Sequence, residues 1–420
     1  MGLKESIARA LPALRHRNYR LFWSGQIISL IGTHMQMTAM SWLVYRITNS
    51  KILLSMIPVM FTLPVLFLSM YAGTVADRMS KRRLLLITQT AFLVQAVAVA
   101  ALATSAHPAV WALLVLSLIQ GAIQSFDAPV RQSFVSEMVP EQDIMNAVAL
   151  NSSVFNGTRV IGPAVAGVLI ATVGEVSCFY INAASFLAVI AGIMMMRDRE
   201  LHRAPKREKK SPGSEMKEGF RFVRGEPRIL GLLSIMMVTS IFGMPAFIML
   251  PVFARDILHV GPKGLGWLLS AVGVGAFICT FSLALAKHIR RQGLRILTVD
   301  ALFGVALILF SISRNFYLSM AFVAVAGGSL TAGMAMSNSA LQVLAPPEMR
   351  GRMMGMYIFI FIGMMLPGSL FIGAASHFLD VTITGILSGA LCLALLAIIA
   401  LRYPAVLKID AEAEAPVVSM

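Results

Sequence analysis

The sequence predicts an all-α membrane protein, with about twelve transmembrane helices arranged as two pseudo-symmetric bundles of six. Of the 420 residues, 57% are hydrophobic and only 13% are charged, whereas a soluble domain carries roughly a quarter charged residues. The apolar residues fall in long blocks, each near the roughly 20 residues that a helix needs to cross a bilayer. The charged residues lie almost entirely between these blocks, and mostly between alternate ones.

The apolar blocks give the expected spans and domains. The spans are placed at 21–45, 53–76, 84–105, 109–128, 146–173, 178–196, 229–254, 264–286, 296–313, 316–338, 353–375 and 382–401. The only long polar segment separates the two sets of six, and its composition predicts a solvated linker with a short amphipathic helix around Met216 to Val223. We therefore expect an N-terminal bundle over 1–196, a cytoplasmic linker over 197–228, and a C-terminal bundle with a short tail over 229–420.

Lysine and arginine indicate the orientation in the membrane. With a cytoplasmic N-terminus, the cytoplasmic segments hold 29 of the 35 Lys and Arg residues, the opposite loops hold five, and one, Arg159, lies inside a span. Cytoplasmic loops are enriched in these residues, so both termini are expected in the cytoplasm of a bacterial inner-membrane protein. The net charge of +15 therefore reflects orientation, and no nucleic-acid partner is expected.

The two halves resemble each other weakly around the fifth span of each half. In both, a Pro-Glu pair precedes the span, and Gly and Pro follow inside it at a similar distance. The residues are Pro140, Glu141, Gly162, Pro163 and Gly167 in the first half, and Pro347, Glu348, Pro367, Gly368 and Gly373 in the second. Two related halves indicate alternating access around a central cavity, although chance similarity between apolar helices would also produce this pattern.

The strongest local motif lies between the second and third spans, in segment 73–83. Gly73 allows two helices to approach closely, and Asp77 is placed to accept hydrogen bonds from a helix N-terminus, where the dipole favours an anion. Lys81 to Arg83 are typical cytoplasmic anchors. A simple basic loop would explain these cations but not the Gly-to-Asp spacing.

This segment resembles the loop motif of the major facilitator superfamily, Gly-x-x-x-Asp-Arg-x-Gly-Arg-Lys/Arg. The matching residues are Gly73, Asp77, Arg78, Lys81 and Arg82. Ser80 replaces the second Gly. The resemblance implies a gate latch, in which the Asp faces the eleventh helix and the basic residue pairs with an acid on the fourth. Asp127 is expected to be that acid, and the latch is expected to be one-sided because segment 286–291 of the second half has none.

Other segments resemble the enterobactin-exporter-like branch of that superfamily. They begin at Leu14, Ser41, Phe126, Asn156 and Arg350, and the resemblance covers nearly the whole chain. Because the branch includes siderophore and drug exporters, the resemblance implies export without fixing the substrate.

A Gly/Pro motif on the fifth span resembles one associated with antiporters. Its residues are Gly162, Pro163 and Gly167, which equally fit a packing kink, because Pro bends a helix and Gly permits close packing. Many drug–proton antiporters carry an Arg three residues before the Gln-Gly of the fourth helix. Here Ser117 occupies that position before Gln120-Gly121, so the proton-coupling mechanism of those antiporters does not transfer directly to this sequence.

Polar residues recur every three or four positions on the fourth and fifth spans, and ionisable residues also lie in the first and ninth. The candidates for a substrate and ion cavity are His34, Gln120, Gln124, Asn156, Arg159 and Asp300. Polar stripes on apolar helices face water or another helix rather than lipid, and interhelical hydrogen bonds could explain part of them. His34, Asp127 and Asp300 are the expected proton-coupling groups, because they are the ionisable residues inside the spans. A histidine that is only hydrogen-bonded within the bundle is the alternative.

Arg159 is the only Lys or Arg expected inside a span, and three roles are open for it. It could exchange partners, with Asp127 neutralising it in one conformation and pairing with Lys81 in another. It could bind an anionic group of the substrate. It could also form a static ion pair with Asp127, because a charge in the membrane is costly unless it is paired or wetted.

These features together predict a secondary active transporter that exports a small amphipathic molecule, such as a siderophore, drug-like compound or metabolite, by proton-coupled alternating access. Uptake, lipid flipping, and a non-transporting receptor are the alternatives. The sequence contains no catalytic constellation or nucleotide loop, and neither a cofactor nor a metal is expected. The expected partners are the small-molecule substrate, a proton and membrane lipid, and the expected state is a monomer.

Overall fold

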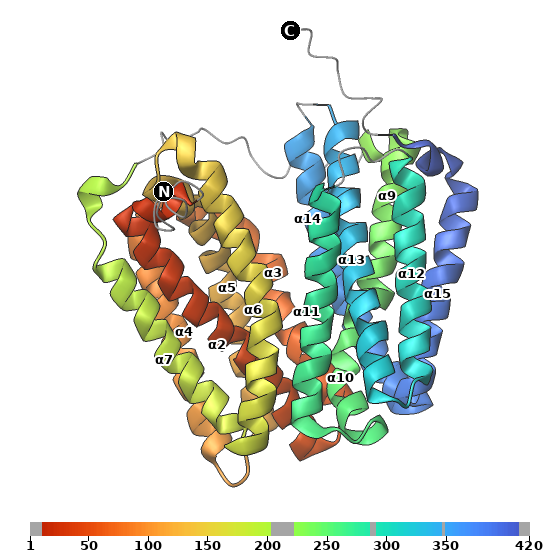
Figure 1. Ribbon diagram of the computed structural model, residues 1–420, viewed down its shortest axis with the longest axis horizontal. Coiled ribbons are helices and arrows are strands. Elements are labelled where there is room, and N and C mark those ends of the chain that lie inside the picture. The colour runs from red at the N-terminus through yellow and green to blue at the C-terminus, as the bar shows by residue number, and fades with distance from the viewer. Residues whose placement is uncertain (1–10, 203–221, 286–290, 347–348, 411–420) are drawn as a thin grey trace, which may run out of the picture. The chain divides into compact units, whose positions relative to one another are not determined.

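The fold is all-helical, as a computed structural model describes it over residues 11–202, 222–285, 291–346 and 349–410. No strand occurs in these ranges, and twelve helices in them are long and apolar enough to cross a membrane. Every predicted span corresponds to one of these helices, so the predicted fold class is confirmed (Figure 1). Helices form because hydrocarbon offers no hydrogen-bond partner, and only a helix satisfies its backbone within one segment.

The first six spans are α2 (Arg17–Thr48), α3 (Lys51–Arg78), α4 (Lys81–Thr104), α5 (Val110–Met138), α6 (Ile144–Thr172) and α7 (Glu175–Met194). The last five are α11 (Gly261–Leu285), α12 (Gln292–Ile312), α13 (Phe316–Leu344), α14 (Arg350–Leu379) and α15 (Val381–Arg402). Side-chain caps fix two of their starts. The Asn315 amide oxygen accepts from the backbone of Tyr317 and Leu318, and the Asp380 carboxylate accepts from Thr382. Such caps satisfy donors that the first helical turn leaves unpaired.

The seventh span is irregular along its length. It consists of α9 (Pro227–Val238), a π-helical turn η4 (Thr239–Gly243), a 3-10 segment η5 (Met244–Met249), α10 (Leu250–Val252) and a second π-helical turn η6 (Phe253–Ile257). Pro245 and Pro251 lie in its irregular part and remove two backbone donors. Both prolines are buried, which fits the rule that broken helices survive at membrane depth only inside protein.

The chain divides into two compact units. Unit 1 comprises Met1–Ile47 and Met60–Arg207, and unit 2 comprises Thr48–Val59 and Glu208–Met420. The first turns of α3 therefore belong to unit 2, where the Lys51 ammonium donates to the Ser376 carbonyl at 2.9 Å. Most of the linker, with most of its predicted amphipathic helix, lies outside the described residues.

Each unit repeats one packing pattern. In unit 1, α4 packs against α5 and α7, and in unit 2 the corresponding spans α12, α13 and α15 pack in the same way. Glycines allow the closest contacts, since they let helix backbones touch. A side-chain carbon at Gly275 of α11 would collide with the backbone of Ala324 on α13, and one at Gly121 of α5 would collide with the backbone of Phe61 on α3.

Gly275→Ala should destabilise the protein by about 1–3 kcal/mol, the usual cost of overpacking a closely packed contact. Gly355→Ala is the matched control in unit 2, because a side-chain carbon at Gly355 would meet nothing within 4 Å. The measurement is the thermal melting of the purified protein in detergent. Equal melting temperatures for the two variants would contradict the close α11–α13 contact.

Candidate functional site

A cationic and aromatic cluster lies between α2 and α6 in unit 1. The Arg159 guanidinium carbon is 5.9 Å from the centroid of the Phe155 ring, within the range of a cation–π contact. The His34 ring meets the same ring edge-on, with centroids 6.3 Å apart. Two residues predicted separately from the sequence, His34 and Arg159, are thus brought together around Phe155, and we call these three residues the His34–Arg159 cluster.

Gly162 explains why α2 and α6 approach so closely here. A side-chain carbon at Gly162 would lie 2.5 Å from the His34 Cβ and 3.2 Å from the Ile31 carbonyl oxygen. Gly162 is one turn from Arg159 on α6, so the missing side chain also sets the distance between Arg159 and α2. The neighbouring Pro163 and Gly167 are buried inside α6. Gly162 of the predicted Gly/Pro motif therefore allows the close contact with His34 at the cluster.

Two polar side chains of the cluster, those of His34 and Arg159, have groups without a polar partner in the described residues. The His34 Nε2 is buried and has no hydrogen-bond partner among the described residues. In the same part of the chain, Arg159 makes no ion pair, and His34 is close enough to interact with it electrostatically. The Phe155 side chain is 49% exposed, so the cluster is open on one side. An anion that reached Arg159 would receive charge-assisted hydrogen bonds there.

Asp127 is fully compensated elsewhere. Its carboxylate is 0% exposed and accepts hydrogen bonds from Thr88 and Gln89 of α4, both at 2.7 Å. It also accepts from Arg131, one turn along α5, with the Nε at 2.8 Å. The predicted pairing of Asp127 with Lys81 or Arg159 is therefore not the one found. Asp127 pairs with Arg131 because residues four apart on a helix are already neighbours.

Lys81 pairs instead with Glu137, whose carboxylate is 2.7 Å from the ammonium group, and also donates to the Ser133 carbonyl at 3.1 Å. Helix depth explains the difference. Glu137 lies at the end of α5 and Lys81 at the start of α4. Asp127 lies ten residues before Glu137, which is about 15 Å deeper along α5. Glu137 was not among the predicted residues, because the fourth span was predicted to end at 128, whereas α5 continues to Met138.

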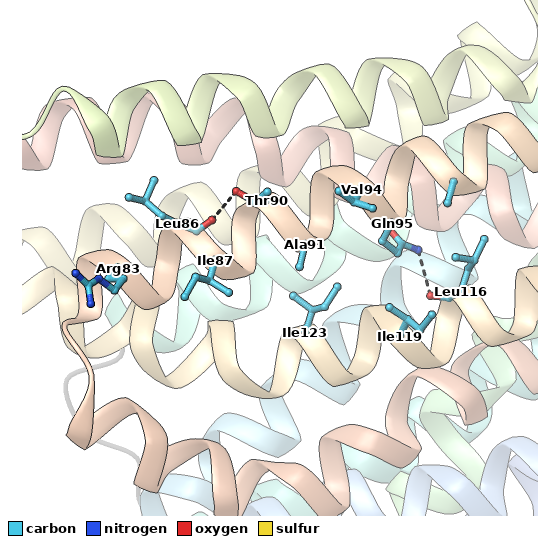
Figure 2. Close-up of a pocket in the computed structure, with 11 residues that line it drawn as sticks. Arg83, Leu86, Ile87, Thr90, Ala91, Val94, Gln95, Leu116, Ile119 and Ile123 are labelled. Atoms are coloured by element: carbon cyan, nitrogen blue, oxygen red, sulfur yellow. Dashed lines mark hydrogen bonds between the residues drawn. The ribbon is translucent and has the colours of Figure 1, made fainter.

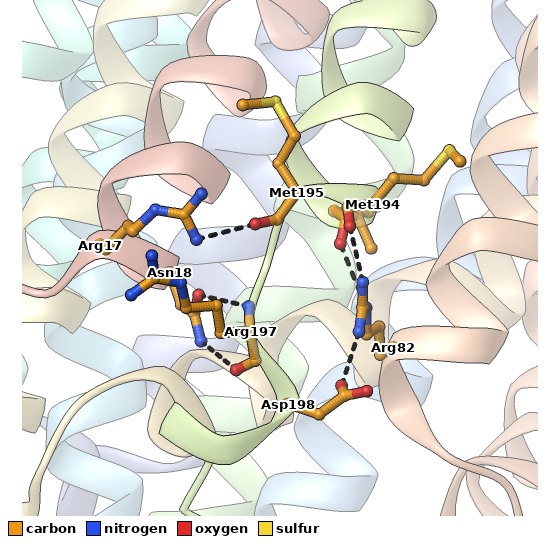
Figure 3. Close-up of polar contacts among 8 residues, drawn as sticks. Arg17, Asn18, Arg82, Met194, Met195, Arg197 and Asp198 are labelled. Carbon is orange, nitrogen blue, oxygen red and sulfur yellow. Dashed lines mark hydrogen bonds and ion pairs between the residues drawn. The ribbon is translucent and has the colours of Figure 1, made fainter.

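Arg82 holds the end of α7 (Figure 3). Its guanidinium contacts the Asp198 carboxylate at 2.6 Å and donates to the Ile193 and Met194 carbonyls at 3.1 and 2.9 Å. Cations at a helix C-terminus satisfy free carbonyls and favour the helix dipole. Arg82 therefore ties the start of α4 to the end of the sixth span.

Arg17 and Asn18 fasten the same end from α2. Arg17 donates to the Met195 carbonyl at 2.8 Å, while the Asn18 side chain donates to the Arg197 carbonyl at 2.9 Å and accepts from its amide at 3.0 Å (Figure 3). The first residues after α7, including the first residue of the linker, are thus fixed to unit 1.

The remaining motif residues cannot be placed in contacts. Gly73, Asp77 and Arg78 belong to the last turns of α3, where the structure describes only the backbone. The latch predicted for Asp77 accordingly stays a prediction.

Comparison with known proteins decides the family. A family model described as a transmembrane secretion effector, of the major facilitator superfamily, matches residues 8–420. The chain belongs to the major facilitator superfamily. This facilitator is therefore a multi-pass bacterial membrane transporter and not an enzyme, as predicted.

Its relatives include exporters. The multidrug efflux pump Tap of Mycolicibacterium fortuitum is 25% identical over 393 residues, covering 90% of this chain and 94% of Tap. The enterobactin exporter EntS of Shigella flexneri is 23% identical over 288 residues, covering 69% of this chain and 68% of EntS. The uncharacterized MFS-type transporter YfiS of Bacillus subtilis is 28% identical over 262 residues, and the match spans only 61% of either chain. The resemblance to the enterobactin-exporter-like branch is confirmed.

A solved structure shows the same fold. A bacterial homologue of the human lysosomal transporter Spinster, in an inward-facing and occupied conformation, has a TM-score of 0.68 at 13% identity. The alignment covers 96% of this facilitator and 99% of that protein.

The other predicted cavity residues of this facilitator lie apart from the cluster's contacts. The Asn156 side chain donates to the Ser152 carbonyl of its own helix at 3.0 Å. Gln120 and Gln124 are half-buried on α5. Asp300 belongs to unit 2, is 2% exposed, and faces Gly333 of α13. No group of three or more metal-ligating side chains forms in the described part of the chain.

Asp127→Asn should destabilise the protein by about 3–5 kcal/mol, because it removes the charge that neutralises Arg131 in a buried pair. Glu137→Gln breaks the pair with Lys81, whose side chains are 20% and 13% exposed, and should cost less than Asp127→Asn because both groups keep some access to water. Melting of both variants in detergent, together with the double variant Asp127→Asn/Arg131→Gln, is the measurement. A double variant less stable than Asp127→Asn would contradict the pairing.

Proposed function

We propose that this facilitator exports a small amphipathic molecule that carries an anionic group, and that the His34–Arg159 cluster is its contact site. The observation behind this proposal is the state of Arg159, a cation within a span that makes no ion pair with any described residue. A charge in a membrane span is stable only when it is paired or wetted. A transported anion would supply the missing partner in the loaded state.

The chemistry of the cluster favours an amphipathic ligand. The half-exposed ring of Phe155 offers an apolar face, Arg159 offers several donors, and the free Nε2 of His34 adds a further polar group. Ligand sites commonly combine apolar walls with a few convergent polar groups. Relatives named as an enterobactin exporter and a multidrug efflux pump agree with a substrate of this class.

Alternating access and proton coupling belong to the same proposal. The repeated packing of the two units supports the first, because two similar bundles can expose one site to either side in turn. His34 supports the second. A proton on His34 would add a second positive charge beside Arg159, so protonation and anion binding would favour each other.

Arg159→Gln should raise the KM for an anionic substrate about 10-fold or more, the value of a lost charge-assisted hydrogen bond. A carboxylate-type siderophore, which is ionised at neutral pH, is the anionic probe and ethidium the cationic one, in proteoliposomes with an imposed pH gradient. Lys263→Gln, an exposed residue with the same charge change, is the control, and Arg159→Lys should retain part of the transport. Unchanged transport of the anionic probe by Arg159→Gln would refute the proposed contact.

His34→Gln should flatten the pH dependence of substrate binding. In the wild type, affinity for the anionic probe should rise as the pH falls, because a proton on His34 would add a positive charge beside the bound anion. In the variant this rise should disappear while affinity at high pH is retained. Equilibrium binding between pH 5 and pH 8 (roughly the histidine range) measures the effect, and an identical pH profile in both proteins would exclude His34 as the proton site.

A further inference from the structure

A groove runs along the surface of unit 1 between α4 and α5 (Figure 2). Its volume is about 710 Å³. Ile87 and Val94 of α4 and Ile119 of α5 line it and are 52%, 63% and 40% exposed. Both helices are membrane spans, so we expect these exposed side chains to face the hydrocarbon core of the bilayer rather than water.

Polar side chains in the groove form hydrogen bonds with other groups of the protein. Thr90 donates to the Leu86 carbonyl at 2.8 Å, and Gln95 donates to the Leu116 carbonyl at 3.2 Å (Figure 2). Gln95 also accepts from Gln36 of α2 at 3.3 Å. A polar substrate would find few free partners along this wall, whereas an acyl chain needs none.

Arg83 stands at one end of the groove as an exposed cation. Its two neighbours are engaged, Lys81 with Glu137 and Arg82 with Asp198. Arg83 itself makes no ion pair or hydrogen bond within the described ranges. This end of α4 is the one that the distribution of Lys and Arg assigns to the cytoplasmic side, where anionic lipids attract basic residues.

The length of the groove matches one lipid chain. Arg83 and Gln95 are twelve residues apart on α4, or about 18 Å along the helix. Half of a hydrocarbon core of roughly 30 Å is about 15 Å. A lipid with its phosphate at Arg83 would therefore extend one chain to the middle of the bilayer without leaving the groove.

We propose that this groove binds an anionic phospholipid, with the phosphate on Arg83 and one acyl chain between α4 and α5. The apolar wall selects a chain and the unengaged cation selects a negative headgroup. The site is separate from the His34–Arg159 cluster and does not depend on what the protein transports.

Native mass spectrometry of the full chain in detergent tests the site, with phosphatidylglycerol and phosphatidylcholine of equal chain length as probes. The wild type should bind phosphatidylglycerol more tightly. Arg83→Gln should weaken that binding about fivefold, the effect of one basic residue at a membrane surface, and Ala91→Phe should block the groove without changing the charge. Arg295→Gln is the matched control, an exposed arginine near the start of α12 and one residue after the position in unit 2 that corresponds to Arg83.

Each result supports or overturns the site. Loss of phosphatidylglycerol in both Arg83→Gln and Ala91→Phe, with Arg295→Gln unchanged, supports it. Equal affinity of the wild type for the two lipids overturns the anionic specificity, and this comparison needs no variant to fold. A loss with Arg83→Gln but none with Ala91→Phe places the lipid outside the groove, and binding of a second copy of the chain in place of lipid overturns the proposed occupant.

Discussion

Hydrocarbon cannot hydrogen-bond, and this constraint shapes both units. In the described part of the chain, backbone groups are satisfied within twelve membrane-spanning helices, and side chains must then find partners inside the protein. Asp127 does so through Thr88, Gln89 and Arg131. The helices can bring such partners together only where they approach closely, which is why glycines stand at the crossings of α11 with α13 and α3 with α5.

The two units satisfy this constraint differently at corresponding positions. Asp127 lies 17 residues after the start of α5, and Gly333 lies 17 residues after the start of α13. Gln89 lies eight residues after the start of α4, as Asp300 does after the start of α12. The acid thus occupies the fourth span in unit 1 and the ninth, the counterpart of the third, in unit 2. Around Asp300 the facing residue is glycine rather than a donor side chain.

Sequence reasoning recovered what depends on local composition and spacing. The twelve spans of the described residues followed from apolar blocks. The pairing of Asp127 with Arg131 is equally local, since four residues separate them on one helix, but Lys81 or Arg159 was the predicted partner. The partner of Lys81 could not be chosen, because that requires the relative depth of α4 and α5, and Glu137 and Asp127 differ in depth by about 15 Å. The meeting of His34 with Arg159 likewise required the α2–α6 crossing at Gly162, which no periodicity within one helix reveals.

The broken seventh span has a geometric consequence of its own. Six residues of 3-10 helix, as in η5 (Met244–Met249), rise about 12 Å, whereas the same residues in an α-helix would rise about 9 Å. The π-helical turns on either side are wound more loosely than an α-helix. Any exchange between these windings changes the axial length of the span and rotates the residues beyond it. Conversion of η5 from 3-10 to α-helix would shorten the span by about 3 Å, and one of its ends would move by that distance.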